Sequence, residues 1–167
     1  LLSSANSINV ARLIPQSFYY FHAFSQLENR DTVVFSVPSG NFGNLTAGIL
    51  SKFMGLPVEK FIAATNSNDT VPIFMETGLY NPKPSVETIS NAMDVGNPSN
   101  MKRILDIYKN YELLKNDIES WSFDDSQTKE QIIATLQLDN YILDPHASVG
   151  LLGLNKYNNK TNASRIF

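Results

Sequence analysis

The chain has 167 residues and is 43% hydrophobic, which is enough for one ordinary domain with its own core. Its net charge is only -3 and its basic residues are scattered, so it lacks the footprint of a nucleic-acid or membrane-surface protein. The absence of cysteine excludes disulfides and thiolate metal sites, and no apolar run approaches the length of a membrane span. We therefore expect a cytoplasmic protein that binds neither nucleic acid nor membrane.

Residues 1–7 are expected to lead into a helix. Asn6 or Ser7 would serve as its N-cap, and the same side chains could instead face a ligand. Arg12 follows about one and a half helical turns after Ser7, so a hydroxyl and a guanidinium could converge on one anion. The alternative is that Arg12 is an ordinary solvated arginine, which is the commoner case.

An aromatic helix is predicted next, over residues 16–27, with Pro15 near its start. Its apolar residues point in several directions, which favours a core helix over a surface helix. A self-association face is the alternative. We expect His22, within this helix, to be packed and hydrogen-bonded. The apolar residues are Phe18, Tyr19, Tyr20, Phe21, Phe24 and Leu27.

The centre of the sequence predicts a strand, a glycine-containing loop and a helix. Residues 33–37 are mainly β-branched and aromatic, as in a strand buried on both faces of a parallel sheet. The following helix has Gly55 at its expected C′ position and Pro57 just beyond. Apolar residues recur at helical spacing at Leu45, Ile49, Leu50, Phe53 and Met54.

The loop between them has the features of an anion site. Gly40 and Gly43 allow a sharp turn and a close approach to a ligand. Backbone N–H groups would meet there at the positive end of the helix dipole, which suits a phosphate. The residue after Gly43 is Asn44, so this is not a Walker A loop, and G-x-G-x-x-G is absent too. A turn that uses glycine for geometry alone remains the alternative.

A second strand over residues 60–65 completes a βαβ unit, whose crossover should be right-handed. Residues 66–69 then emerge at the same sheet edge as residues 40–44, where open α/β sheets bind ligands. The simpler interpretation is that Asn68 or Asp69 caps a helix over residues 70–76.

The segment over residues 78–99 has no regular pattern, which makes it either a functional loop or a disordered one. Met93 and Val95 favour partial burial. A helix should then begin at Asn97 and Pro98 and run through Tyr108.

The last third of the chain predicts a strand over residues 117–123 and a helix over residues 124–138, with Ile132, Ile133 and Leu136 facing inward. Asp144 as N-cap and Pro145 at the first position begin an apolar helix that runs to residue 157. His146 lies near that start and is either structural or at the edge of a site.

These elements predict an α/β fold with an open, mainly parallel sheet flanked by helices. The chain opens on Leu1 without an initiating Met, and its last residues, Ile166 and Phe167, predict the start of another strand. We therefore expect residues 1–167 to be one partial domain of a longer protein.

Several stretches resemble threonine synthases, which are pyridoxal-phosphate enzymes of the tryptophan-synthase-β fold. Residues 39–44, Ser-Gly-Asn-Phe-Gly-Asn, resemble the loop that holds the cofactor phosphate in that family. Further resemblances follow the family's order along the chain. They are residues 6–9 with Arg12, residues 64–66 with 68–69, residues 89–100, and residues 144–146 with 149–150.

The resemblance implies the larger domain of that fold and conversion of O-phospho-L-homoserine and water to L-threonine and phosphate. It implies that pyridoxal 5′-phosphate binds at Ser39, Gly40, Asn41, Phe42, Gly43 and Asn44, and that the substrate phosphate binds at Asn6, Ser7 and Arg12. No metal site is implied. The family usually has Thr-Ala or Gly-Ala where this chain has Ala147-Ser148, so a role for that hydroxyl is in doubt.

The Schiff-base lysine of the family lies in a Ser-Phe-Lys-Asp string upstream of all these motifs, and this sequence contains no such string. Lys52 and Lys60 have unrelated surroundings, so we assign no catalytic residue. We expect an N-terminal segment with that lysine, and the C-terminal end, to be missing, and the isolated chain to be inactive.

Two other functions remain open. A non-catalytic homologue could keep the phosphate cradle without the chemistry, and a serine or threonine dehydratase of the same fold would also use pyridoxal phosphate. Arg12 distinguishes the dehydratase, because its substrate has no phosphate to bind.

Overall fold

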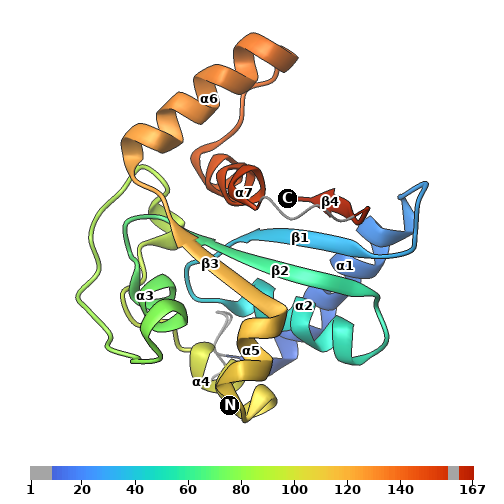
Figure 1. The fold of residues 1–167 in the computed structure, drawn as a ribbon. Helices are drawn as coiled ribbons and strands as arrows, with labels where there is room; N and C mark the ends of the chain where they lie inside the picture. Colours follow the sequence, from blue (N-terminus) through green and yellow to red (C-terminus); the bar gives the residue numbers. More distant parts are fainter. Residues whose placement is uncertain (1–8, 158–161) are drawn as a thin grey trace, which may run out of the picture.

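The computed structural model describes residues 9–157 and 162–167 (Figure 1). Among these residues, no helix is long and apolar enough to cross a membrane. In chain order the elements are the 3-10 turn η1 (Val10–Arg12), α1 (Leu13–Ser25), β1 (Val33–Pro38), α2 (Gly43–Phe53), β2 (Val58–Thr65), α3 (Thr70–Thr77), the 3-10 turn η2 (Asn91–Met93), α4 (Met101–Tyr108), α5 (Tyr111–Asp117), β3 (Ile118–Ser122), α6 (Asp125–Asp139), α7 (Pro145–Lys156) and β4 (Ser164–Ile166).

The strands form one four-stranded sheet in the order β3-β2-β1-β4, and every neighbouring pair is parallel. This confirms the α/β fold with an open parallel sheet. From β1 the chain passes through α2 to β2 on one side, whereas β4 pairs with the other side of β1. The carboxyl end of β1 therefore lies where the strand order reverses, which is the usual ligand position in such sheets.

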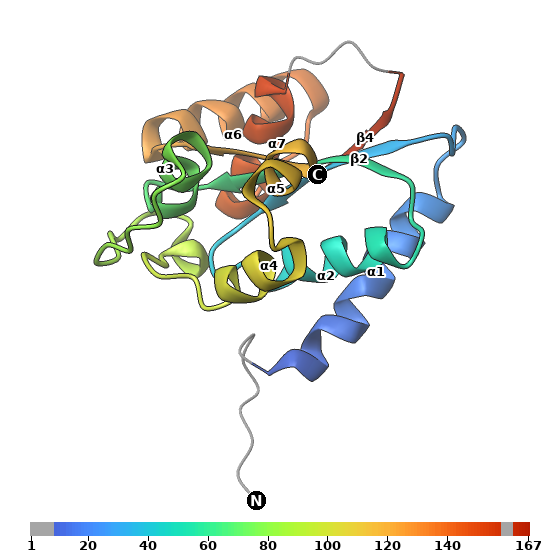
Figure 2. The ribbon, with the colours of Figure 1, turned by 60° about the horizontal axis from the view of Figure 1, so that its bottom comes forward.

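Helices cover both faces of the sheet. In Figure 1, α6 and α7 lie above it, and α1, α2, α4 and α5 lie below; Figure 2 shows α1 and α2 side by side. The side chains of β1 alternate between the two layers. Val33, Phe35 and Val37 belong to the core cluster that includes residues of α1 and α2, and Val34 packs with Tyr157 on the α7 side. The expectation that this strand is buried on both faces is confirmed.

The close fit of α7 on the sheet depends on small residues. Ser36 in β1 donates a hydrogen bond of 2.6 Å from Oγ to the backbone oxygen of Gly150. At Gly153, an added Cβ would lie 2.8 Å from that Oγ and 2.9 Å from Cβ of Ala64. The helix backbone therefore lies directly on the strands, with no room for a side chain between them.

The helix ends follow the local signals where these are strong. Asp144 accepts hydrogen bonds from the N–H groups of His146 and Ala147, and Pro145 occupies the first position of α7, as predicted. Asp124 and Gln127 form a reciprocal capping box at the start of α6. At the end of α2, Gly55 has φ of +106°, the conformation expected at C′.

Two features around α4 differ from expectation. The helix begins at Met101 with Asn100 as N-cap, not at Asn97 and Pro98. The sequence also gave no indication of α5, whose N-cap is Asn110. Its side-chain oxygen accepts hydrogen bonds from the N–H groups of Glu112 and Leu113. Such caps are short polar signals, and they are easily lost between two apolar segments.

The predicted inward face of α6 is wrong for two of its three residues. Ile133 and Leu136 are 54% and 41% exposed, and Thr128 and Thr135 are buried instead. Thr128 offers its backbone oxygen to the hydroxyl of Ser148, so α6 is held to α7 partly through polar contacts. The spacing of apolar residues alone therefore could not predict which side of α6 is buried.

The aromatic helix α1 is also less buried than predicted. Tyr20 is 4% exposed and packs edge-on against Phe35 and Phe61, but Phe18 and Tyr19 are 62% and 66% exposed. His22 is exposed as well, so the expectation of a packed histidine is wrong. Within the described residues, only one face of α1 is thus covered, and this helix packs on α2.

We predict that Gly153→Ala lowers the free energy of unfolding by about 1–3 kcal/mol, because the new methyl group must displace β1 and β2 side chains or lift α7. Urea unfolding followed by circular dichroism measures the change. Lys129→Ala, at an exposed position of α6, is the control and should change stability by less than about 0.5 kcal/mol. Equal stability of the two variants would contradict the close approach.

Candidate functional site

A cavity of about 350 Å³ lies at the carboxyl end of β1. The loop over residues 38–45 forms much of its wall, and Arg12, Gln16, Ala92, Met93 and His146 complete it. Residues from four separate parts of the chain therefore meet at the switch point of the sheet. A larger hollow of about 700 Å³ lies against β3 and α3, away from this loop.

The loop after β1 has a defined conformation. Ser39 donates hydrogen bonds of 2.8 Å from its N–H to Ala64 and from its hydroxyl to the backbone oxygen of Val37. Phe42 then adopts a left-handed conformation with φ of 61°, and α2 begins at the next residue, Gly43. Non-glycine residues rarely adopt this conformation, and those that do cluster at ligand sites.

Several backbone donors of this loop have no acceptor. Within the described residues, the N–H groups of Gly40, Phe42, Gly43 and Leu45 donate no hydrogen bond, and the first bond at this end of α2 runs from Thr46 to Phe42. Phe42, Gly43 and Leu45 are buried. The first N–H groups of any α-helix lack intrahelical acceptors, and these lie at the positive end of the α2 dipole, on residues that line the cavity. The cradle therefore fits an anion such as a phosphate.

Neighbouring elements hold the loop in place. The side-chain oxygen of Asn41 accepts hydrogen bonds from the N–H of Ser99 at 2.7 Å and from its hydroxyl at 2.9 Å. Asn100 donates from Nδ2 to the backbone oxygen of Asn41 at 2.8 Å. From α1, the hydroxyl of Tyr20 donates to Asn44, and burial raises the pKa of this hydroxyl. These contacts of Ser99, Asn100 and Tyr20 with the loop were not predicted from the sequence.

The turn η2 packs directly on the loop. At Gly40, an added Cβ would lie 2.7 Å from Cα of Met93 and 3.1 Å from the backbone oxygen of Ala92. Gly40 thus permits a backbone-to-backbone contact. This is the close approach that glycine was predicted to allow, but its partner here is the chain itself.

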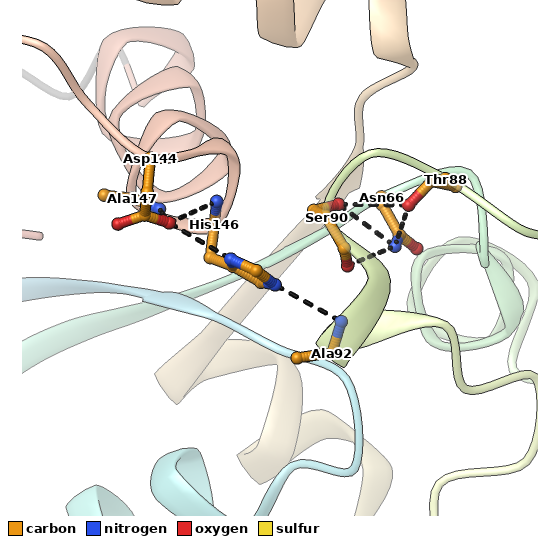
Figure 3. Close-up of polar contacts among 7 residues, drawn as sticks. All are labelled: Asn66, Thr88, Ser90, Ala92, Asp144, His146 and Ala147. Carbon is orange, nitrogen blue, oxygen red and sulfur yellow. Dashed lines mark hydrogen bonds and ion pairs between the residues drawn. The ribbon is translucent and has the colours of Figure 1, made fainter.

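His146 joins α7 to the same turn (Figure 3). Its Nδ1 lies 3.0 Å from Oδ1 of Asp144, and its Nε2 accepts a hydrogen bond of 3.3 Å from the N–H of Ala92. Burial tends to raise the pKa of Asp144, but the N–H groups of Ala147 and His146 and the imidazole outweigh it, and the pKa is lowered. Asp144 is therefore a carboxylate at neutral pH.

The polar residues after β2 do reach this edge, but their side chains are occupied. Asn66 is 1% exposed and donates from Nδ2 to Thr88 at 2.8 Å and to Ser90 (Figure 3). The same nitrogen lies 2.8 Å from Oδ1 of Asp94. Its oxygen accepts from Asn68. This network fixes the long segment over residues 78–99 against the sheet. Asp69 is the N-cap residue of α3, as the simpler interpretation predicted, but its side chain makes no capping hydrogen bond and pairs with Lys83 instead.

The structure brings Arg12 and residues 39–44 together at one cavity. Asn6 and Ser7 lie outside the described residues. The N-cap of the η1 turn is Asn9, whose side-chain oxygen accepts from the N–H of Ala11.

Neither lysine considered from the sequence lines this cavity. Lys52 pairs with Asp117 at 2.8 Å, and Lys60 donates to the backbone oxygen of Asn116. Among the residues that the structure describes, no group of His, Asp and Glu side chains is arranged to hold a metal ion.

Comparison with known proteins gives consistent relatives. No protein-family model matches the chain. The chain is 48% identical over 150 residues to the threonine synthase of Haemophilus influenzae, a match that covers 89% of this chain and 35% of that protein. It therefore spans about a third of the length of the curated relatives it matches.

Solved structures agree. The crystal structure of threonine synthase from Escherichia coli superposes with a TM-score of 0.91 at 45% identity, covering 99% of this chain and 39% of that one. The pyridoxal-phosphate-bound threonine synthase from Brucella melitensis gives 0.91 at 31% identity, covering 99% and 41%. Maize serine racemase, at 16% identity and a TM-score of 0.63 over 90% of this chain and 45% of that one, shares the fold alone.

We predict that Gly40→Ala weakens binding of inorganic phosphate at this cavity by about tenfold, because the new methyl group must separate the loop from the η2 backbone. Isothermal titration calorimetry measures the affinity. Gly55→Ala is the matched control: its Cβ would meet nothing within 4 Å, but φ of +106° strains it. It should lower stability and leave phosphate affinity unchanged. Equal affinities in both variants would contradict the prediction.

Proposed function

We infer that this chain is the phosphate-loop segment of a threonine synthase, and we propose that the protein to which it belongs converts O-phospho-L-homoserine and water to L-threonine and phosphate. The observation that carries the proposal is the set of N–H groups without an acceptor in the loop that lines the cavity, which Arg12 also lines. The near-50% identity to threonine synthases supports the choice of reaction.

The loop over residues 39–44 would hold the phosphate of pyridoxal 5′-phosphate. Its N–H groups supply donors without a charged side chain, and the α2 dipole adds favourable electrostatics for a phosphate. The hydroxyl of Ser39 is already used by Val37, so Ser39 would contribute through its place in the turn. When bound, the cofactor supplies an electron sink for carbanion chemistry.

Arg12 would bind the phosphate of the substrate. It lines the cavity from η1, a different element from the loop, so a second anion could be held by its guanidinium without using the N–H groups. Asn6 and Ser7 would join it. The proton-moving lysine would belong to a part of the protein outside these 167 residues, since the relatives are about three times as long.

Two other functions are weaker. A dehydratase of the same fold would explain the loop but not an arginine at the cavity. A non-catalytic phosphate-binding homologue would explain both. Turnover of O-phospho-L-homoserine by the full-length protein, with none by the isolated 167-residue chain, distinguishes it. A cytoplasmic location stays a prediction.

We predict that Arg12→Ala in the full-length protein weakens substrate binding by about 2 kcal/mol or more, roughly 30-fold, through loss of a charge-assisted contact. Steady-state kinetics with O-phospho-L-homoserine measure KM and kcat, and Arg12→Lys should recover part of the loss.

The control for that experiment is Arg30→Ala. Arg30 is exposed and donates to the backbone oxygens of Leu27 and Ser25, away from the cavity. Its KM and kcat should stay within about twofold of wild type. If Arg12→Ala behaves like Arg30→Ala, Arg12 does not bind the substrate phosphate.

Self-association through α1 is also proposed. The exposed Val10, Ile14, Phe18 and Phe21 recur at helical spacing, with exposed fractions of 60%, 62%, 62% and 38%. A second copy would bury this stripe.

We predict that full-length wild type is a dimer by light scattering and that Phe18→Glu makes it a monomer, because a charge would be buried at the contact. Leu138→Glu, the same kind of change at an 83% exposed position on α6, should leave the dimer intact. A monomeric wild type would contradict self-association.

A further inference from the structure

We propose that His146 is a positioning residue for the phosphate loop: in its neutral form it holds the η2 turn against Gly40, and it releases that turn on protonation. The proposal rests on the proposed role of the loop in holding a phosphate. Figure 3 shows the connection, from Asp144 through the imidazole of His146 to the N–H of Ala92.

The partners of the ring define its protonation state. The N–H of Ala92 can only donate, so Nε2 must carry the lone pair that accepts its hydrogen bond. The ring proton then lies on Nδ1, where it donates to the carboxylate of Asp144. Asp144 is itself held by the N–H groups at the start of α7. The ring is thus fixed in one tautomer and one orientation.

The bond to Ala92 acts on the loop through direct packing. The backbone of Ala92 and Met93 lies where a Cβ on Gly40 would be, so a shift of η2 changes the wall of the loop at Gly40. The other supports act farther along: Ser99 and Asn100 hold Asn41, and Tyr20 holds Asn44. His146 therefore connects to the beginning of the loop.

Protonation would break this connection. A doubly protonated imidazole presents an N–H to the N–H of Ala92, and two donors repel. The charged groups around the ring are Asp144, whose Oδ1 lies 3.0 Å from Nδ1, and Arg12, which lines the same cavity. Two other carboxylates are hydrogen-bonded to the segment that precedes η2. Asp94 accepts from the N–H and the hydroxyl of Thr88, and Asp125 accepts from the N–H of Ile89.

His146 also lines the cavity, which raises a competing role. If its ring touched the bound phosphate directly, protonation would strengthen binding. The positioning role has the opposite sign, because protonation loosens the loop. The pH dependence of affinity therefore distinguishes the two roles.

The test uses the full-length protein freed of cofactor and titrated with 4′-deoxypyridoxine 5′-phosphate, which has the ring and phosphate of the cofactor but no aldehyde. At pH 8 we expect His146→Ala to raise Kd about fivefold, the effect of one lost hydrogen bond. His146→Gln should stay within about twofold of wild type, because its amide oxygen can accept from Ala92. His22→Gln, at an exposed site on α1, is the matched control and should not change Kd.

Lowering the pH from 8 to 6 should raise Kd more in wild type than in His146→Gln, because an imidazole can take up a second proton and an amide cannot. The ligand's own phosphate also titrates, but this affects wild type and His146→Gln equally, so it cancels when the two are compared at each pH. Hydrogen exchange provides a readout without ligand: the amide of Ala92 should exchange faster in His146→Ala, and as slowly as in wild type in His22→Gln.

The outcomes distinguish failure of the proposed function from failure of the proposed role of His146 alone. Failure of wild type to bind the probe would overturn the proposed function and this proposal with it. Binding by wild type that His146→Ala leaves unchanged would overturn this proposal alone, as would unchanged exchange at Ala92. A wild-type affinity that rises relative to His146→Gln as the pH falls would also overturn it, in favour of direct contact with the phosphate.

Discussion

The N–H groups at the carboxyl end of β1 impose the main constraint on this structure. Phe42, Gly43 and Leu45 have N–H groups without an acceptor among the described residues, and all three residues line one cavity. To present these groups together, the surrounding structure must hold the loop in one conformation. The left-handed residue Phe42 has the same requirement.

The surrounding elements meet that requirement from three directions. The α4 start holds Asn41, α1 holds Asn44 through Tyr20, and η2 packs on Gly40. The η2 turn is in turn fixed to the sheet by the Asn66 network, and α7 contacts the sheet closely enough for His146 to reach it. Polar residues that resemble ligand contacts in the sequence therefore serve mainly to make the cradle rigid.

Local signals explain why part of this was predictable. The strand, the loop and α2 are specified by a β-branched run, two glycines and an apolar period within about 25 residues, and all three are found. The caps at Asp124 and Asp144 are equally local. Arg12 reaches the loop differently, from η1 at the start of α1, and α1 packs on α2.

Other features depend on partners far away in the sequence, and these were either not predicted or predicted wrongly. Asn66 looks like a ligand residue until Thr88 and Asp94 are folded against it. Asn100 stands at the N-cap position of α4 while its side chain reaches back to Asn41, and the helix begins there and not at the earlier Asn97 and Pro98. On α6, apolar side chains face outward because the contact with α7 is partly polar, and no periodicity in α6 contains that information.

The two interpretations of the glycine loop, an anion site and a turn that uses glycine for geometry alone, predict different backbone features. A turn that used glycine only for geometry would place its positive φ at Gly40 or Gly43. Here the residue with positive φ in the turn is Phe42, and Gly40 is instead required by the contact with η2. The N–H groups of Gly40, Phe42, Gly43 and Leu45 have no acceptor within the described residues, and these residues line one cavity, an arrangement that suits an anion such as a phosphate.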